Sequence, residues 1–331
     1  MRLSIGVPAY NQGSFLRETL DSLIHQDVSF YEIVVSNNHS TDNTPGVLAA
    51  FARDYPGRIR MVTPPQHLPA AAHWNFTVSQ LAGDWVSLMS SDDLALPNFV
   101  RSVTSATTLS PNALLVRGAW RNIDSAGTTL EERHLISVAA VTRPPKTIYE
   151  QRLGPKGSFA AFALRRDIWQ KTGGFPEDLP LIADWGMWLL AGAFGDFIYT
   201  DDVISSYRVG HQQPAHQQRH HIYLSEVFRL YDQVLPRATT LAGLGGPAWI
   251  ARASRTTFRE MLAACSRDFA PPDRGLLVDA FRPWAESLGE TARLTRFAAG
   301  DRVRDFNPAL PARMFARRLV AALRRTPRES H

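Results

Sequence analysis

The sequence predicts an α/β protein with a mainly parallel sheet between helices and a C-terminal helical appendage. Short apolar segments that suit strands alternate with segments whose apolar residues recur at helical spacing. This alternation is typical of a parallel sheet covered by helices. The chain has 331 residues, more than one compact core usually holds, so we expect a second, smaller domain.

Each element of the first 90 residues is predicted from its own pattern. The first strand ends at Pro8, which cannot donate a hydrogen bond to a sheet. The second strand runs into NNHSTDNTPG, a segment rich in turn residues. The expected order is strand 3–8, helix 15–24, strand 32–36, helix 46–55, strand 59–64, a helix after Pro69 and strand 85–89.

Polar motifs follow three of these strands. PAYN comes after the first strand, SNNHSTD after the second and SSDD after the fourth. Ligands of parallel α/β sheets bind at the carboxyl ends of the strands. We therefore expect the three loops to converge on one edge of the sheet.

The second half of the chain is less regular. Residues 112–120 and 195–209 contain strand-like runs, and residues 183–194 show helical spacing. Beyond residue 212 the pattern is helical and rich in arginine. The predicted domains are therefore residues 1–212 and 213–331.

Charge and cysteine content limit the classes of function. Residues 1–210 hold 17 basic and 20 acidic residues, a net charge of −3, whereas residues 211–331 hold 19 and 11, a net charge of +8. This asymmetry suits either an anionic partner or a solvated helical surface. The single cysteine, Cys265, excludes an internal disulfide and a multi-cysteine metal site. The basic residues come without a reading motif for nucleic acid, so no nucleic-acid partner is expected.

The chain is expected to be cytoplasmic. No apolar run approaches the roughly 18 residues that span a bilayer. The opening MRLSIGVPAYN lacks an apolar signal core and is interpreted as a strand rather than an export signal.

The acids Asp92 and Asp93 stand directly after an apolar strand. Two adjacent aspartates can form a solvated turn. They can also bind a hard cation such as Mg²⁺ or Mn²⁺, which prefers carboxylate oxygens together with water and substrate phosphates. The two other polar loops expected at this edge favour the cation site.

Five blocks of the sequence resemble the inverting family 2 glycosyltransferases with the GT-A fold, of the non-processive type that builds bacterial cell-surface polysaccharide. The resemblance covers about residues 2–212. The blocks are VPAYNQGSFLRETLDSLIHQ, EIVVSNNHSTDNT, HWNFTVSQLAGDWVSLMSSDD, FALRRDIWQKTGGFPEDL and ADWGMWLLAGAFGDFIYTDDVISSYRVGH. The resemblance implies the GT-A nucleotide-diphospho-sugar transferase fold. It also implies a nucleotide-diphosphate sugar donor, a divalent Mn²⁺ or Mg²⁺ ion and a glycan or lipid-linked acceptor.

The resemblance also implies roles for the matching positions. Inverting transfer needs a base beside the acceptor hydroxyl and no protein nucleophile. The implied roles are nucleotide-sugar binding for Pro8, Ala9, Tyr10, Asn11, Asn37, Asn75, Ser91 and Asp92, metal binding for Asp93 and His211, general base for Asp184, and acceptor contact for Trp185. Lys156 and Gly157, in GPKGSF outside the five blocks, are candidates for an acceptor loop.

Plainer interpretations of several positions stay open. Asp184 can offset a helix dipole, His211 can be an ordinary loop histidine, and Asn75 can cap a turn. Asn37 stands where the family usually has aspartate, which leaves a UDP-sugar or a dTDP-sugar as the donor. Ala183 replaces a glutamate beside the base.

Residues 309–331 plot as an amphipathic, arginine-rich helix. Such a helix can lie on an anionic membrane surface, so peripheral attachment at the cytoplasmic face of the inner membrane is one hypothesis. Packing against the helical domain or a second subunit is the other.

Two rival functions compete with glycosyl transfer. A sugar-1-phosphate nucleotidyltransferase should carry a glycine-rich phosphate loop near the N-terminus, which GVPAYNQGS lacks. A non-catalytic nucleotide-sugar-binding scaffold would be expected to lose its acids, yet Asp92, Asp93 and Asp184 are present.

Overall fold

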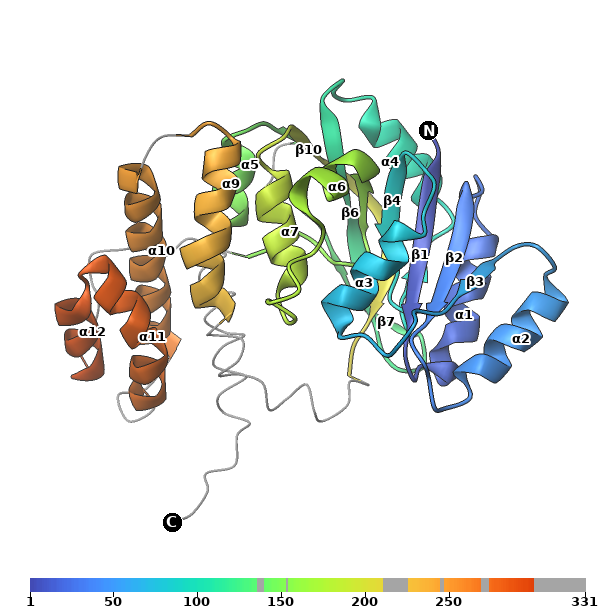
Figure 1. Ribbon diagram of the computed structural model, residues 1–331, viewed down its shortest axis with the longest axis horizontal. Helices are drawn as coiled ribbons and strands as arrows, with labels where there is room; N and C mark the ends of the chain where they lie inside the picture. The colour runs from blue at the N-terminus through green and yellow to red at the C-terminus, as the bar shows by residue number, and fades with distance from the viewer. Residues whose placement is uncertain (136–139, 153, 211–225, 245–246, 269–273, 301–331) are drawn as a thin grey trace, which may run out of the picture. The chain divides into compact units, whose positions relative to one another are not determined.

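The computed structural model describes residues 1–135, 140–152, 154–210, 226–244, 247–268 and 274–300 (Figure 1). These residues fall into two compact units. The first lies within Met1–Thr147 and Pro155–His211, and the second within Ile148–Gly154 and Gln212–His331.

The first unit is built on one twisted sheet. Along the hydrogen-bonded path the strands follow the order β3-β2-β1-β4-β9-β6-β10-β5, while β7 pairs with β6 and β8 with β10. In the described part of the chain the strands are β1 Leu3–Ala9, β2 Glu32–Asn37, β3 Arg60–Val62, β4 Trp85–Leu88, β5 Leu94–Ala95, β6 Ala113–Ile123, β7 Thr129–Arg133, β8 Val141–Thr142, β9 Phe162–Arg165 and β10 Asp196–Arg208.

The predicted parallel pairing is confirmed in the N-terminal half of the sheet. Strand β1 pairs in parallel with both β2 and β4, and β2 pairs in parallel with β3. Strand β6 is also parallel to β10. The other pairs are antiparallel, and β9 enters the sheet between β4 and β6. The sheet is therefore mixed beyond β4, which local sequence patterns did not predict.

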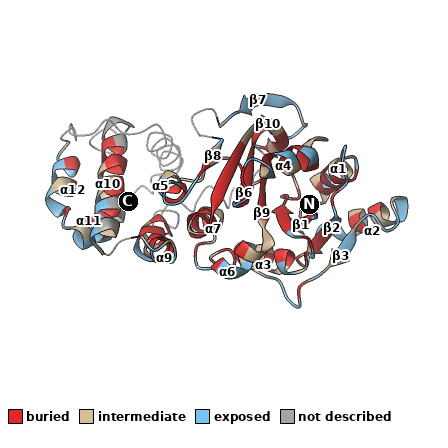
Figure 2. Ribbon diagram, turned by 90° about the horizontal axis from the view of Figure 1, so that it is seen from above, coloured by how far each residue is buried: buried red, intermediate tan, exposed pale blue. Residues whose placement is uncertain are grey.

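Helices cover both faces of the sheet. One apolar layer contains side chains of α1, α2 and α4, and the other contains side chains of α3, α6 and α7. Figure 2 shows the buried strands between these two sets. The helices described in this unit are α1 Gly13–Ile24, α2 Thr44–Asp54, α3 Ala70–Ser79, α4 Phe99–Thr107, α6 Arg166–Thr172 and α7 Ala183–Ala191. The short α5 Lys146–Gln151 begins in this unit and continues into the second at Ile148.

The described part of the second unit is helical, as the pattern beyond residue 212 predicts. Its centre is aromatic: the Tyr231 and Trp284 rings stack at 4.8 Å, Phe281 stacks near Trp284, and Phe258 packs edge-on against both Phe281 and Trp284. The helical segments are η2 Leu230–Val234, α9 Leu235–Leu241, α10 Pro247–Asp268, α11 Gly275–Leu288 and α12 Thr291–Ala298. Within the described residues, no helix combines the length and apolarity needed to cross a membrane. The predicted helix 309–331 lies outside those residues.

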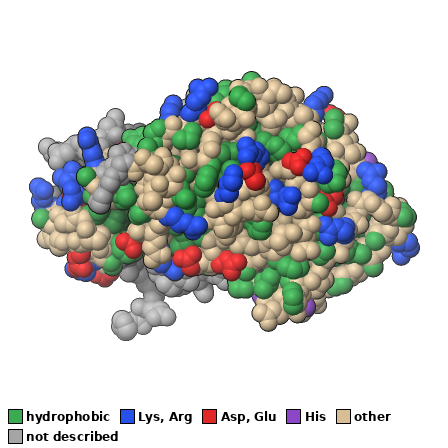
Figure 3. All heavy atoms as spheres, turned by 45° about the horizontal axis from the view of Figure 1, so that its top comes forward, with side chains coloured by type: hydrophobic (Ala, Val, Ile, Leu, Met, Phe, Trp, Pro, Cys, Tyr) green, Lys and Arg blue, Asp and Glu red, His purple; other side chains and the backbone are tan. Residues whose placement is uncertain are grey.

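Basic side chains on the visible surface are dispersed. Figure 3 shows Lys and Arg groups scattered over one face, several of them beside acidic groups. Two such pairs are Arg2–Asp84 at 2.6 Å and Arg165–Asp167 at 2.6 Å. Exposed pairs of this kind contribute at most about 1 kcal/mol each. The expectation of no nucleic-acid partner stays a prediction.

Candidate functional site

Three polar loops meet at the carboxyl edge of the sheet, as the sequence predicts. Because β1 lies in parallel between β2 and β4, all three strands end on the same side. Backbone hydrogen bonds continue past the strand ends, from Asn38 N–H to Ala9 O at 2.9 Å and from Met89 N–H to Gly6 O at 2.9 Å. The sheet itself therefore brings the motifs PAYN, SNNHSTD and SSDD together.

Asn11 ties the first loop to the second. Its Oδ1 accepts a hydrogen bond from the backbone N–H of Thr41 at 2.7 Å, and its own N–H donates to Ser40 Oγ at 3.1 Å. The φ angle of Asn11 is 51°, in the left-handed region that asparagine tolerates better than most residues. Asn11 thus shapes the loop where the resemblance expects the base and ribose.

Side-chain hydrogen bonds fix the second loop, both within the loop and to Leu68. The Asn37 side chain accepts the backbone N–H of Ser40 at 3.1 Å, which closes a tight turn. Asn38 is buried and pairs with both backbone groups of Leu68, at 2.8 and 2.9 Å. The position predicted to contact the nucleobase, Asn37, therefore stands on a braced turn.

Tyr10 is the exposed aromatic group of this edge. It is 44% exposed, and its ring packs edge-on against the His67 ring with 4.7 Å between centroids. Ala9 is fully buried and Pro8 partly so, which leaves mainly their backbone to face a ligand. Tyr10 and His67 together offer an aromatic surface to a flat ring.

His73 of α3 is buried against the second strand, β2. It is 4% exposed, and its Nε2 lies 2.8 Å from Ser36 Oγ. Burial lowers the pKa of His73 to about 4, so the imidazole is neutral at physiological pH. The neighbouring Trp74 stacks on Phe159 at 4.6 Å and belongs to the core.

Asp93 is a buried carboxylate in the loop between β4 and β5. It is 1% exposed, and its Oδ1 accepts the backbone N–H of Arg208 at 2.8 Å. Its Oδ2 is buried and has no hydrogen-bond partner among the described residues. Burial raises the pKa of Asp93 well above the usual range, and the charge of Asp92 raises it further. An orphaned carboxylate oxygen of this kind suits a cation.

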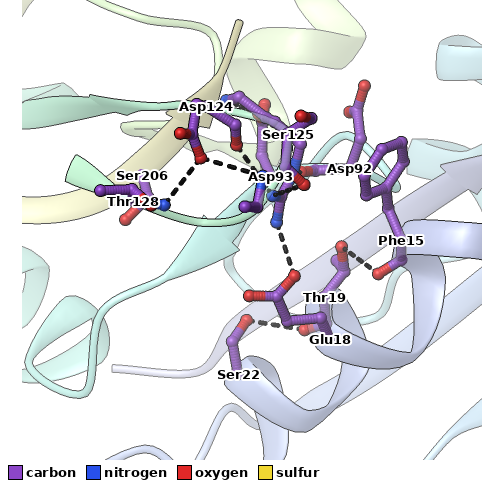
Figure 4. A network of polar contacts seen from close by, with 12 residues as sticks. Phe15, Glu18, Thr19, Ser22, Asp92, Asp93, Asp124, Ser125, Thr128 and Ser206 are labelled. Carbon is purple, nitrogen blue, oxygen red and sulfur yellow. Dashed lines mark hydrogen bonds and ion pairs between the residues drawn. The ribbon is translucent and has the colours of Figure 1, made fainter. Parts of the chain in front are cut away.

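Arg208 organises the residues around Asp93, although the sequence analysis assigned it no role. Its buried guanidinium donates to Asp92 O at 2.8 Å, to Asp124 O and Ser125 O at 3.1 Å each, and to Glu18 Oε2 at 2.6 Å. Figure 4 shows the acceptors converging from α1, the SSDD loop and the 124–125 turn. Arg208 therefore fixes the position of both candidate acids.

Asp184 lies in the first turn of α7. Its Oδ1 accepts the backbone N–H of Trp185 at 2.8 Å, and the residue is half-buried. Trp185 itself is 1% exposed, so its side chain belongs to the interior. The predicted base therefore stands at a helix N-terminus, where the dipole favours its charged form.

The predicted acceptor loop lies over a buried arginine. Lys156 and Gly157 are both half-exposed, and Gly157 has a φ of 99°. A Cβ on Gly157 would stand 3.1 Å from Nε of Arg117 on β6. A signal for Arg117 was present in the sequence, because it is an arginine inside the otherwise apolar run ALLVRGAW.

Asn75 joins α3 to the segment after α6. Its Nδ2 donates to Phe175 O at 2.9 Å and to Glu177 Oε1 at 3.0 Å, while its Oδ1 accepts from Phe175 N–H at 2.8 Å and Trp169 Nε1–H at 3.2 Å. These bonds use the whole amide. The predicted nucleotide-sugar contact of Asn75 stays a prediction beside this structural role.

The candidate cation ligands are few. Within the described residues no group of three or more His, Cys, Asp or Glu side chains is arranged to hold a metal ion. His211, the second predicted ligand, lies outside them. Asp93 with Asp92 still fits a hard cation that keeps water or phosphate oxygens as its remaining ligands, because Asp93 Oδ2 is unsatisfied.

Residues 4–172 match the family model described as Glycosyl transferase family 2. The chain belongs to this family. Its curated relatives include chondroitin synthase of Pasteurella multocida strain Pm70, 25% identical over 209 residues, which covers 61% of this chain and 20% of that protein. Another is chondroitin synthase of Escherichia coli, 22% identical over 235 residues, which covers 71% of this chain and 33% of that protein. The chain thus spans about a fifth to a third of the length of these family 2 relatives.

Solved structures share the fold of this chain. S. aureus TarS 1–349 in complex with UDP-GlcNAc has a TM-score of 0.61 and 14% identity, covering 91% of this chain and 88% of that chain. The same protein in complex with UDP has a TM-score of 0.57 and 15% identity over similar shares. At this identity the likeness concerns the fold, and the predicted GT-A fold is confirmed.

Proposed function

We propose that this protein is a metal-dependent inverting glycosyltransferase. It would move one sugar from a nucleotide-diphosphate donor, a UDP-sugar or a dTDP-sugar, to a hydroxyl of a glycan or lipid-linked acceptor. One observation carries the proposal. In a family 2 chain, the unsatisfied Oδ2 of Asp93 lies at the sheet edge where the PAYN and SNNHSTD loops meet.

The donor would lie across this edge. Tyr10 with His67 offers an aromatic surface to the base, and Asn37 Oδ1 can accept a second hydrogen bond besides that of Ser40. Asp92 would face the ribose or sugar. Asp93, with the proposed ligand His211, would hold Mn²⁺ or Mg²⁺, which offsets the negative charge of the leaving diphosphate.

Asp184 would act as the general base. The acceptor oxygen forms a bond to the anomeric carbon as the bond from that carbon to the diphosphate oxygen breaks. The hydroxyl proton passes to the Asp184 carboxylate, and attack opposite the leaving group inverts the anomeric centre. No residue of the chain becomes covalently linked to sugar in this scheme.

The test begins with the donor. A thermal-shift screen of nucleotide sugars with Mn²⁺ selects the donor that raises the melting temperature most. Release of nucleoside diphosphate from that donor is then measured with glycan and polyprenyl-linked acceptors. Asp184→Asn is expected to keep the donor affinity and to lose transfer by about 10²-fold or more.

Asp178→Asn is the matched control, because Asp178 is an exposed acid six positions earlier in the chain. It should transfer sugar at the wild-type rate. Transfer by Asp184→Asn at the wild-type rate would show that another group is the base.

We also propose peripheral membrane attachment through residues 309–331. Their amphipathic, arginine-rich pattern suits an anionic surface on which a lipid-linked acceptor is presented. Flotation with liposomes that contain anionic lipid is expected for the full chain and lost on removal of 309–331. Equal flotation of both proteins would rule out this attachment.

A further inference from the structure

Arg117 is a buried cation whose guanidinium is only partly satisfied. It is 0% exposed and stands on β6 in register with Tyr199 of β10 and Phe162 of β9. Its Nη2 donates to Ser158 O at 3.3 Å, while Nε and Nη1 are buried without a hydrogen-bond partner among the described residues. A charge buried in this way is costly and requires a compensating group.

The guanidinium lies against the helix that carries the proposed base. The Arg117 Cζ stands 4.7 Å from the centre of the Trp188 ring. Trp188 follows Asp184 by four positions on α7, so the two side chains share one face of that helix. Arg117 thus packs on the helix face to which Asp184 belongs.

The same guanidinium supports the proposed acceptor loop. Gly157 lies so close that a Cβ would stand 3.1 Å from Arg117 Nε and 3.6 Å from Cζ. The carbonyl of the next residue, Ser158, accepts the Nη2 hydrogen bond. Arg117 therefore joins the 155–158 loop to α7.

The charges around Arg117 act in opposite directions. Burial lowers the pKa of Arg117 to about 10, whereas the ionisable groups that face it, Tyr199 on β10 and Asp184 on α7, act to raise it. The guanidinium still carries its proton at neutral pH, and Asp184 is the carboxyl group among those that act on it.

We propose that Arg117 is a positioning residue: its buried guanidinium places a positive charge against the face of α7 that carries Asp184 and ties that helix to the 155–158 loop. The inference rests on the proposed role of Asp184 as base and deepens that site. Arg117 does not touch substrate, because it is fully buried. A base held beside the acceptor loop is oriented toward the hydroxyl that it deprotonates.

A double-mutant cycle tests the link without any substrate. The melting temperature at pH 7 is measured for wild type, Arg117→Gln, Asp184→Asn and the double variant. The double variant should lose less than the sum of the two single losses, by about 3 °C or more, because each substitution removes the same interaction. Arg117→Lys, which keeps the charge, should retain more of the melting temperature than Arg117→Gln.

Arg121 provides the matched control. It is an arginine of the same strand, with its Nε bonded to Ser206 Oγ at 2.8 Å. The cycle of Arg121→Gln with Asp184→Asn should be additive. An additive Arg117 cycle, or Lys and Gln variants of equal melting temperature, would overturn the inference.

If Arg117→Gln does not fold, the melting temperature of Asp184→Asn tests the inference by itself. Removal of the carboxylate leaves the guanidinium uncompensated, so the melting temperature should fall by several degrees, whereas Asp178→Asn should leave it unchanged. An unchanged or raised melting temperature in Asp184→Asn would overturn the inference. These outcomes are independent of the transfer assay, which alone decides whether Asp184 is the base.

Discussion

The backbone N–H of Arg208 donates a 2.8 Å hydrogen bond to Oδ1 of Asp93. These residues are 115 positions apart in the chain, and the bond joins the end of β10 to the residue directly before β5, which pairs with β10. It occupies one carboxylate oxygen and leaves the other, Oδ2, unsatisfied. The pairing of β5 with β10 therefore holds the candidate cation ligand in place.

Arg208 should stabilise this arrangement through its whole side chain. Arg208→Lys removes the donors to Asp124 O, Ser125 O and Glu18, and it leaves a buried ammonium with fewer partners. We expect a loss of about 3 kcal/mol in the free energy of unfolding. Urea denaturation at pH 7 measures it.

Glu18→Gln is the control for this prediction. The Glu18 side chain is 52% exposed, so solvent screens its pair with Arg208 and the expected loss is under about 1 kcal/mol. If Glu18→Gln were as costly as Arg208→Lys, the surface ion pair rather than the buried carbonyl contacts would be the source of the stability.

His73 should make stability depend on pH. Its folded pKa of about 4 lies below the unfolded value of 6.5, so the unfolded state binds the proton first as the pH falls. The contribution of His73 to the free energy of unfolding is then complete above about pH 6.5 and decreases toward pH 4. Between pH 7 and pH 5 this single group should cost about 2 kcal/mol.

His73→Gln tests the assignment, because glutamine does not titrate and can still bond to Ser36. The free energy of unfolding is measured for both proteins from pH 7 to pH 5. The wild type should lose about 2 kcal/mol more than the variant over this range. Parallel curves would mean that His73 is not the group responsible.

The close contact between Gly157 and Arg117 can be separated from backbone strain. Gly157 and Gly154 both have positive φ, at 99° and 120°, but a Cβ on Gly154 would meet nothing within 4 Å. Both alanine variants carry the strain, and Gly157→Ala alone presses on Arg117. We expect Gly157→Ala to cost about 1 kcal/mol more in unfolding free energy than Gly154→Ala.

The same pair of variants should differ in sugar transfer. Gly157→Ala should slow transfer while leaving donor affinity intact, because the loop and the base are displaced together. Gly154→Ala should transfer normally. If Gly157→Ala and Gly154→Ala lost stability and transfer equally, the contact with Arg117 would not be the cause.

The convergence of three polar loops could be predicted from the sequence because it needs only parallel pairing of successive strands. The alternation of strands and helices through residue 89 implies that pairing, and the register of β1 with β2 and β4 confirms it. The insertion of β9 between β4 and β6 could not be predicted. Strand order across a sheet is a tertiary property, and residues 162–165 carry no local sign of their neighbours.

The roles of Arg117 and Arg208 were also not predicted. Arg117 interrupts an apolar strand, which indicates a buried charge, whereas Arg208 follows the polar segment ISSY. The partners of both lie on elements far away in sequence. Asn75 shows that a predicted binding role can coincide with a structural one. Its block resembles a donor-binding segment, yet its amide hydrogen bonds go to residues near 170–177, which only the folded chain brings close.

Asp93 should hold the cation on which the donor diphosphate binds. Calorimetric titration of UDP and of dTDP, each with Mn²⁺ and with EDTA, measures this in the wild type, Asp93→Asn and Asp196→Asn. Asp196 is also a buried acid, 4% exposed, but accepts its hydrogen bond from Ser110 on another part of the sheet. We predict that Mn²⁺ strengthens nucleotide binding at least about tenfold in the wild type and Asp196→Asn, and has no effect in Asp93→Asn. Equal, Mn²⁺-dependent binding by Asp93→Asn and the wild type would contradict the claim.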